Sequence, residues 1–110
     1  MVINILELNK DNFNEFTGSG LKMVYLGASW CGPCKVLGPI IDQMAIEYAS
    51  ENTTVKIGKL NVDDNRDVAV SLGVTSIPTI LVYKDGVLVD RNIGMTQKTQ
   101  LKTLMEKYIS

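Results

Sequence analysis

The pattern of apolar and polar positions near the start of the chain predicts two strands joined by a short helix. Residues 2–6 are apolar and β-branched, which favours a short first strand. Residues 11–20 indicate a short helix that begins near Asn9 or Asp11 and ends at a pair of glycines. Residues 21–28 form a continuous apolar run between turn-forming residues, so we expect a buried central strand.

A longer helical pattern follows at residues 32–50, where apolar side chains recur at helical spacing. Pro39 lies inside this pattern, directly after Gly38. Because proline lacks a backbone N–H and crowds the preceding turn, we expect the helix to bend there.

Strand and helix patterns continue to alternate after the long helix. Residues 53–62 alternate between apolar and polar side chains, which predicts a strand with Val55, Ile57 and Leu60 turned inward. Residues 63–73 begin with aspartate and asparagine and end in glycine, the pattern of one short helix.

The end of the chain predicts a hairpin and a closing helix. Residues 79–93 contain two β-rich runs around an Asp-Gly pair, a strong signal for a hairpin turn. Residues 96–109 predict an amphipathic helix with Thr96 as its N-cap and a stripe made of Leu101, Leu104, Met105 and Tyr108 or Ile109. The order β-α-β-α-β-α-β-β-α predicts an α/β fold with a mixed central five-stranded sheet and helices on both faces.

The size and charge of the chain limit the number of domains and the kinds of partner that it can have. Its 110 residues suffice for a single domain, residues 1–110, whose core needs no disulfide. A formal net charge of −1, with both signs interspersed, argues against nucleic-acid binding. No apolar run approaches the roughly 20 residues that span a bilayer, and the N-terminus lacks the features of a signal peptide. We therefore expect a cytoplasmic monomer that binds neither membrane nor nucleic acid.

The candidate chemistry lies in two cysteines, Cys31 and Cys34, which enclose Gly32 and Pro33 and follow Trp30. Paired cysteines in a cytoplasmic chain are more often catalytic or metal-binding than structural. A structural zinc site takes four protein ligands, and the absence of any further cysteine and of histidine disfavours it. Two inert core cysteines are the other alternative, which the position of the pair between a buried strand and a helix disfavours.

Thiol–disulfide exchange fits the position of the pair. Cys31 lies where the long helix begins, and the free N–H groups and helix dipole there favour a thiolate, so we expect a lowered pKa. Lys35 adds a nearby positive charge. Cys34 lies one turn further along and is expected to be less exposed. Cys31 would attack a substrate disulfide, and Cys34 would then resolve the mixed disulfide.

Several segments together resemble the thioredoxin family over nearly the full length of the chain. The sequence WCGPCK at residues 30–35 resembles the active-site motif of that family, with Gly-Pro between the cysteines as in reducing members. The other matching segments are KLNVDDN (59–65), SIPT (76–79), YKDG (83–86) and IGMTQK (93–98). The resemblance implies the thioredoxin fold and thiol–disulfide oxidoreductase activity.

The resemblance also implies a role for individual residues. Cys31 matches the attacking cysteine and Cys34 the resolving one, with Gly32 and Pro33 in support. Pro78 matches a cis-proline that faces the two sulfurs, and in the family the backbone before it pairs with an extended substrate segment. From the residues alone, Pro78 also fits a simple proline at the start of a strand.

An apolar substrate-binding surface around Cys31 is implied as well, consisting of Trp30, Gly32, Pro33, Ile77, Gly94 and Met95. For three of these residues the sequence leaves a structural alternative open. Trp30 fits a core side chain, Gly94 a plain loop glycine and Met95 a core filler.

The chain departs from the family pattern beneath the cysteines. The family usually has a buried aspartate where this chain has Tyr25, and commonly a tryptophan at the position of Gly27. Tyrosine ionises only near pH ~10, so Tyr25 is a poor base for Cys34. The missing bulk at Gly27 predicts a more open surface. Lys59 matches the lysine next to that aspartate, so we expect it either to reach solvent or to assist Cys34 electrostatically.

The sequence therefore predicts a reductant of disulfide-containing target proteins that a separate thioredoxin reductase re-reduces. The resemblance implies an NADPH-dependent flavoprotein for that reductase, but Tyr25 and Gly27 leave its type open. The sequence contains no phosphate-binding glycine loop and no metal-ligand constellation, so no cofactor or metal is expected. Two alternatives remain: an oxidase or isomerase of the same fold, and a non-catalytic scaffold subunit of a larger assembly.

Overall fold

The computed structural model describes residues 5–51 and 53–109. In chain order the elements are β1 (Ile5–Glu7), α1 (Phe13–Thr17), β2 (Leu21–Gly27), α2 (Gly32–Ser50), β3 (Lys56–Asn61), α3 (Arg66–Ser71), β4 (Thr79–Lys84), β5 (Val87–Ile93) and α4 (Lys98–Glu106). This order confirms the one predicted from the sequence. Residues 2–4 of the predicted first strand lie outside the described ranges. No helix within those ranges has the length and apolar character needed to cross a bilayer.

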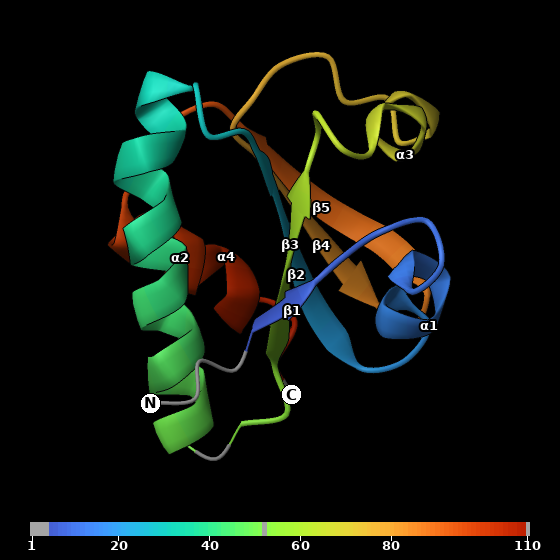
Figure 1. The fold of residues 1–110 in the computed structure, drawn as a ribbon. Helices are drawn as coiled ribbons and strands as arrows, with labels where there is room; N and C mark the ends of the chain where they lie inside the picture. The colour runs from blue at the N-terminus through green and yellow to red at the C-terminus, as the bar shows by residue number, and fades with distance from the viewer. Residues whose placement is uncertain (1–4, 52, 110) are drawn as a thin grey trace.

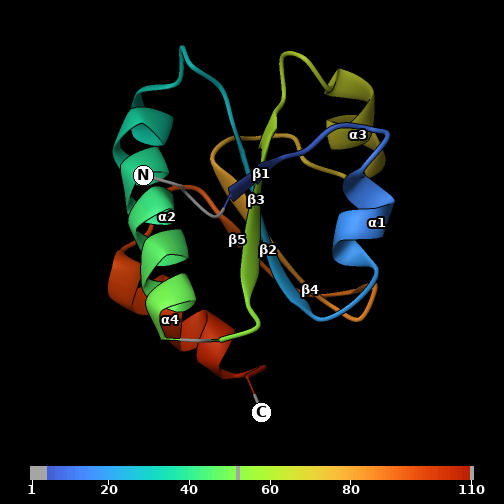
Figure 2. The same cartoon turned by 60° about the horizontal axis from the view of Figure 1, so that its bottom comes forward.

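The strands form one mixed sheet in the order β1-β3-β2-β4-β5 (Figure 1). The first three strands of this order run parallel, β4 pairs antiparallel with β2, and β5 pairs antiparallel with β4 at the edge of the sheet. Helices α2 and α4 cover one face of the sheet, while α1 and α3 cover the other, as both ribbon views show (Figure 2). The expected five-stranded sheet with helices on both faces is confirmed.

Strand β2 supplies side chains to both faces because successive residues of a strand point in opposite directions. Met23 and Tyr25 lie in the core cluster beneath α2 and α4. Val24 and Leu26 lie in the second cluster, beneath α1 and α3. The parallel register with β3 places Lys59 directly beside Tyr25, on the α2 side of the sheet.

The local sequence signals explain the turns. Asp85 and Gly86, with φ of 50° and 88°, form the β4–β5 turn, which confirms the hairpin predicted from the Asp-Gly pair. Val55, Ile57 and Leu60 are buried, as predicted.

Two predicted helix starts are wrong by a residue or more. The N-cap of α4 is Gln97 rather than Thr96, because the Gln100 side chain folds back and accepts the Gln97 backbone N–H at 3.3 Å. The N-cap of α1 is Asn12, and the Asn9 side chain accepts N–H groups of the turn before it. Helix α2 continues through Pro39 without a break.

Candidate active site

The two cysteines lie where β2 passes into α2, at the carboxyl end of a parallel strand pair. Strand β2 ends at Gly27, and a tight turn closed by the Cys31 N–H and the Ala28 carbonyl (3.3 Å) leads into the helix. Open α/β sheets place their functional groups at this end of the strands.

Cys31 is the N-cap of α2. Its backbone is extended (φ −81°, ψ 117°), and its Sγ accepts the backbone N–H of Cys34 at 3.3 Å. An N-cap side chain ordinarily uses oxygen for this bond, so here the sulfur takes the place of a serine or aspartate oxygen. Pro33 lies in the first turn, where a missing N–H leaves no bond unmade. The helix start therefore directs a hydrogen-bond donor at the Cys31 sulfur.

Both cysteines are free thiols, and each is only 5% exposed. The expectation that Cys34 is less exposed than Cys31 is therefore wrong. Burial raises the pKa of the Cys31 thiol, the neighbouring Cys34 thiol adds to the rise, and the hydrogen bond from the Cys34 N–H opposes it. The net shift is upward, so the lowered pKa expected for Cys31 is also wrong in this dithiol state. The sequence could not show that the Cys31 side chain is buried although its neighbours Gly32 and Pro33 are exposed.

Pro78 follows Ile77, whose backbone lies beside Cys31. The Ile77–Pro78 peptide bond is cis, as the resemblance implies, and the Ile77 carbonyl oxygen lies 4.0 Å from the Cys31 sulfur. Pro78 also directly precedes β4, so its position at a strand start is correct as well. The Gly94 N–H donates to the Pro78 carbonyl at 2.8 Å, and Gly94 has a φ of 87°, which favours glycine. These features fit the loop glycine that the sequence left open for Gly94, and they tie that loop to Pro78.

Trp30 and Met95 expose large apolar surfaces near Cys31. Trp30 is 66% exposed and Met95 48% exposed, so neither is a core side chain. The Trp30 indole N–H donates to Asp63 Oδ2 at 2.7 Å, which fixes the ring. Sequence reasoning did not assign a role to Asp63. The signal was available, because Asp63 follows β3 and Trp30 follows β2, and these strands are parallel neighbours.

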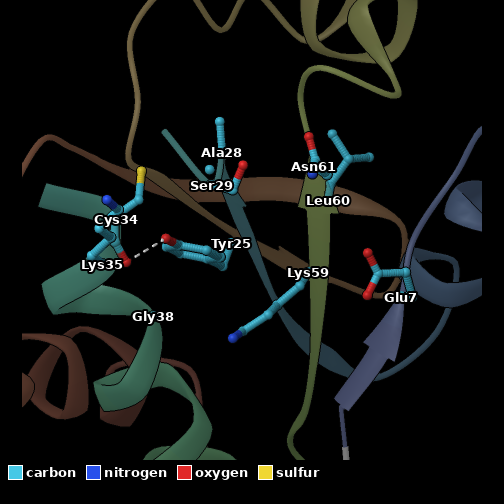
Figure 3. A pocket seen from close by; sticks show the side chains of 11 residues that line it. Glu7, Tyr25, Ala28, Ser29, Cys34, Lys35, Gly38, Lys59, Leu60 and Asn61 are labelled. Atoms are coloured by element: carbon cyan, nitrogen blue, oxygen red, sulfur yellow. Dashed lines mark hydrogen bonds between the residues drawn. The ribbon is translucent and has the colours of Figure 1, made fainter. Parts of the chain in front are cut away.

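An open pocket of about 250 Å³ lies beneath Cys34, between α2 and the sheet (Figure 3). The Tyr25 ring points from β2 toward the first turns of α2, and Lys59 points the same way from β3. Cys34 lines the same pocket. In the part of the chain that the structure describes, no three Cys, Asp or Glu side chains are grouped to hold a metal ion.

The Tyr25 ring fills the space that Gly27 leaves. A Cβ atom at Gly27 would lie 2.6 Å from the Tyr25 hydroxyl oxygen and 2.8 Å from the adjacent ring carbon, closer than real atoms approach. Gly27 lines the open pocket, as the missing bulk predicts, and the hydroxyl end of Tyr25 lies where a side chain at position 27 would begin.

Lys59 has a carboxylate partner, and its side chain is 26% exposed, so it reaches solvent in part as expected. Its Nζ lies 2.5 Å from Asp42 Oδ1 and 5.6 Å from the centre of the Tyr25 ring. Asp42 follows Cys34 and Gly38 at intervals of four residues, so all three lie on one face of α2. That spacing was the sequence signal for this pair.

Comparison with known proteins agrees with this geometry. The family model described as Thioredoxin matches residues 4–107. A thioredoxin from Chlamydia caviae is 41% identical over 101 residues, covering 92% of this chain and 95% of that protein. A thioredoxin from Staphylococcus haemolyticus is 38% identical over 105 residues, covering 96% of this chain and 98% of that protein.

A solved structure shows the same architecture. A mutant thioredoxin from Halobacterium salinarum superposes with a TM-score of 0.85 at 29% identity, covering 96% of this chain and 91% of that chain. One family assignment follows from the fold, from the Cys31–Cys34 pair at the start of α2 and from these relatives. The chain belongs to the thioredoxin family and is a thiol–disulfide oxidoreductase that works by dithiol–disulfide exchange.

Proposed function

We propose that this chain acts as one domain, residues 1–110, that reduces disulfides of target proteins, with Cys31 as the attacking nucleophile and Cys34 as the resolving thiol. The observation that carries this assignment is the 3.3 Å hydrogen bond from the Cys34 N–H to the Cys31 sulfur. A donor directed at one sulfur stabilises negative charge on that sulfur, and the thiolate is the form that attacks. Gly32 and Pro33 support the reaction by forming the helix start that carries this donor.

In the first step the Cys31 thiolate attacks one sulfur of the target disulfide. A bond forms between the two sulfurs, and the other target sulfur leaves as a thiolate that takes up a proton. In the second step the Cys34 sulfur loses its proton and attacks Cys31, which releases the second target sulfur. Two electrons and two protons thus pass from the dithiol to the target. The second attack is fast because both sulfurs lie on one helical turn.

The target binds across the apolar surface around Cys31. Trp30 and Met95 present exposed apolar side chains there, and the cis bond places the Ile77 carbonyl beside the Cys31 sulfur. An extended target segment pairs with the backbone before Pro78, and the apolar side chains pack against it. Gly94 supports this surface through its bond to Pro78.

Lys59 contributes as a supporting residue whose charge is balanced by Asp42 at 2.5 Å. A separate thioredoxin reductase returns the Cys31–Cys34 disulfide to the dithiol. The setting is the cytoplasm, and the acting species is a monomer without bound metal, cofactor, membrane or nucleic acid.

The roles of the two cysteines are tested by single substitutions assayed on a protein disulfide, with the parent and a thioredoxin reductase as reference. Cys31→Ser is expected to abolish reduction, because no attacking thiolate remains. Cys34→Ser is expected to form a covalent mixed disulfide with the target that persists, which mass spectrometry detects. The two roles would be reversed if persistent adducts formed on Cys34 in the Cys31→Ser variant and none formed on Cys31 in the Cys34→Ser variant. Unchanged biological activity of Cys31→Ser would favour a scaffold role instead.

A further inference from the structure

Tyr25 is a buried polar side chain that the two-step reaction leaves without a role. Its hydroxyl donates a hydrogen bond to the backbone carbonyl of Cys34 at 3.2 Å (Figure 3). That carbonyl belongs to the residue to which the proposed function assigns the resolving step, so the inference below rests on that proposal. Tyr25 thus holds the first turn of α2 directly at the second thiol.

The contact depends on a pair of residues. The hydroxyl of Tyr25 occupies the space in which a Cβ at Gly27 would lie, at a separation of 2.6 Å. Any residue larger than glycine at position 27 would push the hydroxyl away from Cys34. Tyr25 and Gly27 are two residues apart in β2, so they point to the same face of the sheet. The strand geometry therefore places the Tyr25 ring over Gly27.

The Tyr25 hydroxyl and the Cys34 side chain line the same pocket. Burial raises the pKa of Tyr25, and its interactions with the Cys34 side chain raise it further. The hydroxyl therefore keeps its proton at any working pH. Tyr25 is a hydrogen-bond donor at this site, and it does not act as a base.

Several other titratable groups lie around Tyr25 and Cys34. Those groups within the described ranges are Cys31 at the helix start, Lys35 and Asp42 on α2, Lys59 on β3 and Glu7 on β1 across the pocket. Lys59 is paired with Asp42 at 2.5 Å, and its charge lies 5.6 Å from the centre of the Tyr25 ring. The ammonium is thus engaged by a carboxylate on the same side of the sheet.

We propose that Tyr25 is a positioning residue for the resolving step: its hydroxyl donates its one proton to the Cys34 carbonyl in the dithiol, and turns to donate it to the Cys34 sulfur as that sulfur loses its own proton. In that step the Cys34 proton leaves and ends on the departing target thiolate. The Cys34–Cys31 bond forms, the Cys31–target bond breaks, and its electron pair leaves with the target sulfur. A donor beside the Cys34 sulfur stabilises the negative charge that develops before the new bond is complete.

The test separates the two steps with 5,5′-dithiobis(2-nitrobenzoate) under single-turnover conditions. Attack by Cys31 releases one coloured thiolate, and resolution by Cys34 releases a second. Tyr25→Phe keeps the ring and removes only the hydroxyl. We expect the first release to stay within about twofold of the parent, and the second to slow roughly tenfold, the factor equivalent to one pKa unit. The pH at which the second release is half-maximal moves upward.

The matched control is Tyr48→Phe. Tyr48 lies in the same core cluster, and its buried hydroxyl has no hydrogen-bond partner among the described residues. Its removal is expected to leave both releases unchanged. In a Cys31→Ser background, the pH dependence of Cys34 alkylation by iodoacetamide gives a second readout, which Tyr25→Phe should move upward.

The outcomes separate this inference from the proposed function. Unchanged second release in Tyr25→Phe overturns the positioning role and leaves the proposed function standing. Equal slowing of both releases also overturns it, because the hydroxyl then acts on the whole helix start. A parent protein that releases only one coloured thiolate contradicts the resolving role of Cys34 itself.

Discussion

At the scale of single residues, the pocket beneath Cys34 differs from the family pattern through linked changes. Tyr25 takes the position of the usual aspartate, and Gly27 leaves the room that its ring requires. Lys59 keeps a carboxylate partner, which comes from Asp42 on the helix rather than from the strand. The charge of the lysine therefore stays balanced although the strand carboxylate is gone, and an unbalanced ammonium in this pocket is avoided.

The fit between Tyr25 and Gly27 gives a stability prediction. Gly27→Ala places a Cβ 2.6 Å from the Tyr25 hydroxyl oxygen, so we expect it to lower the free energy of unfolding. Overpacking of a core typically costs about 1–3 kcal/mol, which urea denaturation resolves. In a Tyr25→Val background the same substitution should cost less, with a coupling of about 1 kcal/mol in the double-mutant cycle.

Gly32→Ala is the control for that cycle, because a Cβ at Gly32 meets no other atom within 4 Å. It is expected to cause no loss of stability. Equal costs of Gly27→Ala in the two backgrounds would mean that the side chain of Tyr25 does not set the glycine requirement.

At the scale of elements, α4 is docked on α2 by ion pairs and on the sheet by a hydrogen bond from the residues that follow it. Glu47 on α2 contacts Lys98 and Lys102, the latter at 2.5 Å. Near the other end the Tyr108 hydroxyl donates to Asp90 Oδ2 on β5 at 2.8 Å. These contacts hold the helix over the face of the sheet that carries Tyr25.

Acid should weaken this docking. The hydrogen bonds from Lys102 and Lys98 lower the pKa of Glu47, and the hydrogen bond from Tyr108 lowers that of Asp90. A carboxyl with a depressed folded-state pKa stabilises the fold above its unfolded pKa, about 4, and this stability is lost as the pH falls through the folded value. We therefore expect the free energy of unfolding to fall on acidification from about pH 5 toward pH 3.

Substitution identifies the groups responsible. Glu47→Gln and Asp90→Asn should each reduce the acid dependence of unfolding, measured with urea at both ends of that pH range. Glu15→Gln, on the exposed side of α1, serves as control and should leave the dependence unchanged. An identical acid dependence in the parent, Glu47→Gln and Asp90→Asn would show that other carboxyls account for it.

The sequence predicted elements better than contacts. The order of strands and helices followed from periodicity and from the Asp-Gly turn, because these signals are local. The pair between Lys59 and Asp42 joins a strand to a helix, and only the packing of α2 on the sheet brings them to 2.5 Å. The burial of Cys31 likewise depends on the closed surface around the helix start, so its pKa direction was wrong from local arguments.

At the scale of the whole molecule, the sheet separates two hydrophobic clusters, and the two cysteines belong to one of them. The cluster under α2 and α4 includes both cysteines and Tyr25, whereas the cluster under α1 and α3 includes neither cysteine. The site joins two separate parts of the chain, the stretch from Trp30 to Cys34 and the Ile77–Pro78 bond, which the topology brings to the end of β2. The fold thus buries the dithiol within the first of these clusters and leaves the neighbouring Trp30 side chain exposed.

The central claim is that Cys31 and Cys34 form a reducing pair, and a redox titration against thiol buffers tests it most directly. Trp30, the one tryptophan of the chain and the neighbour of Cys31, reports the change by fluorescence. We predict a two-electron transition with a midpoint in the strongly reducing range, well below those of oxidising folding catalysts. A midpoint in the range of those catalysts would contradict the account and indicate an oxidase or isomerase of the same fold.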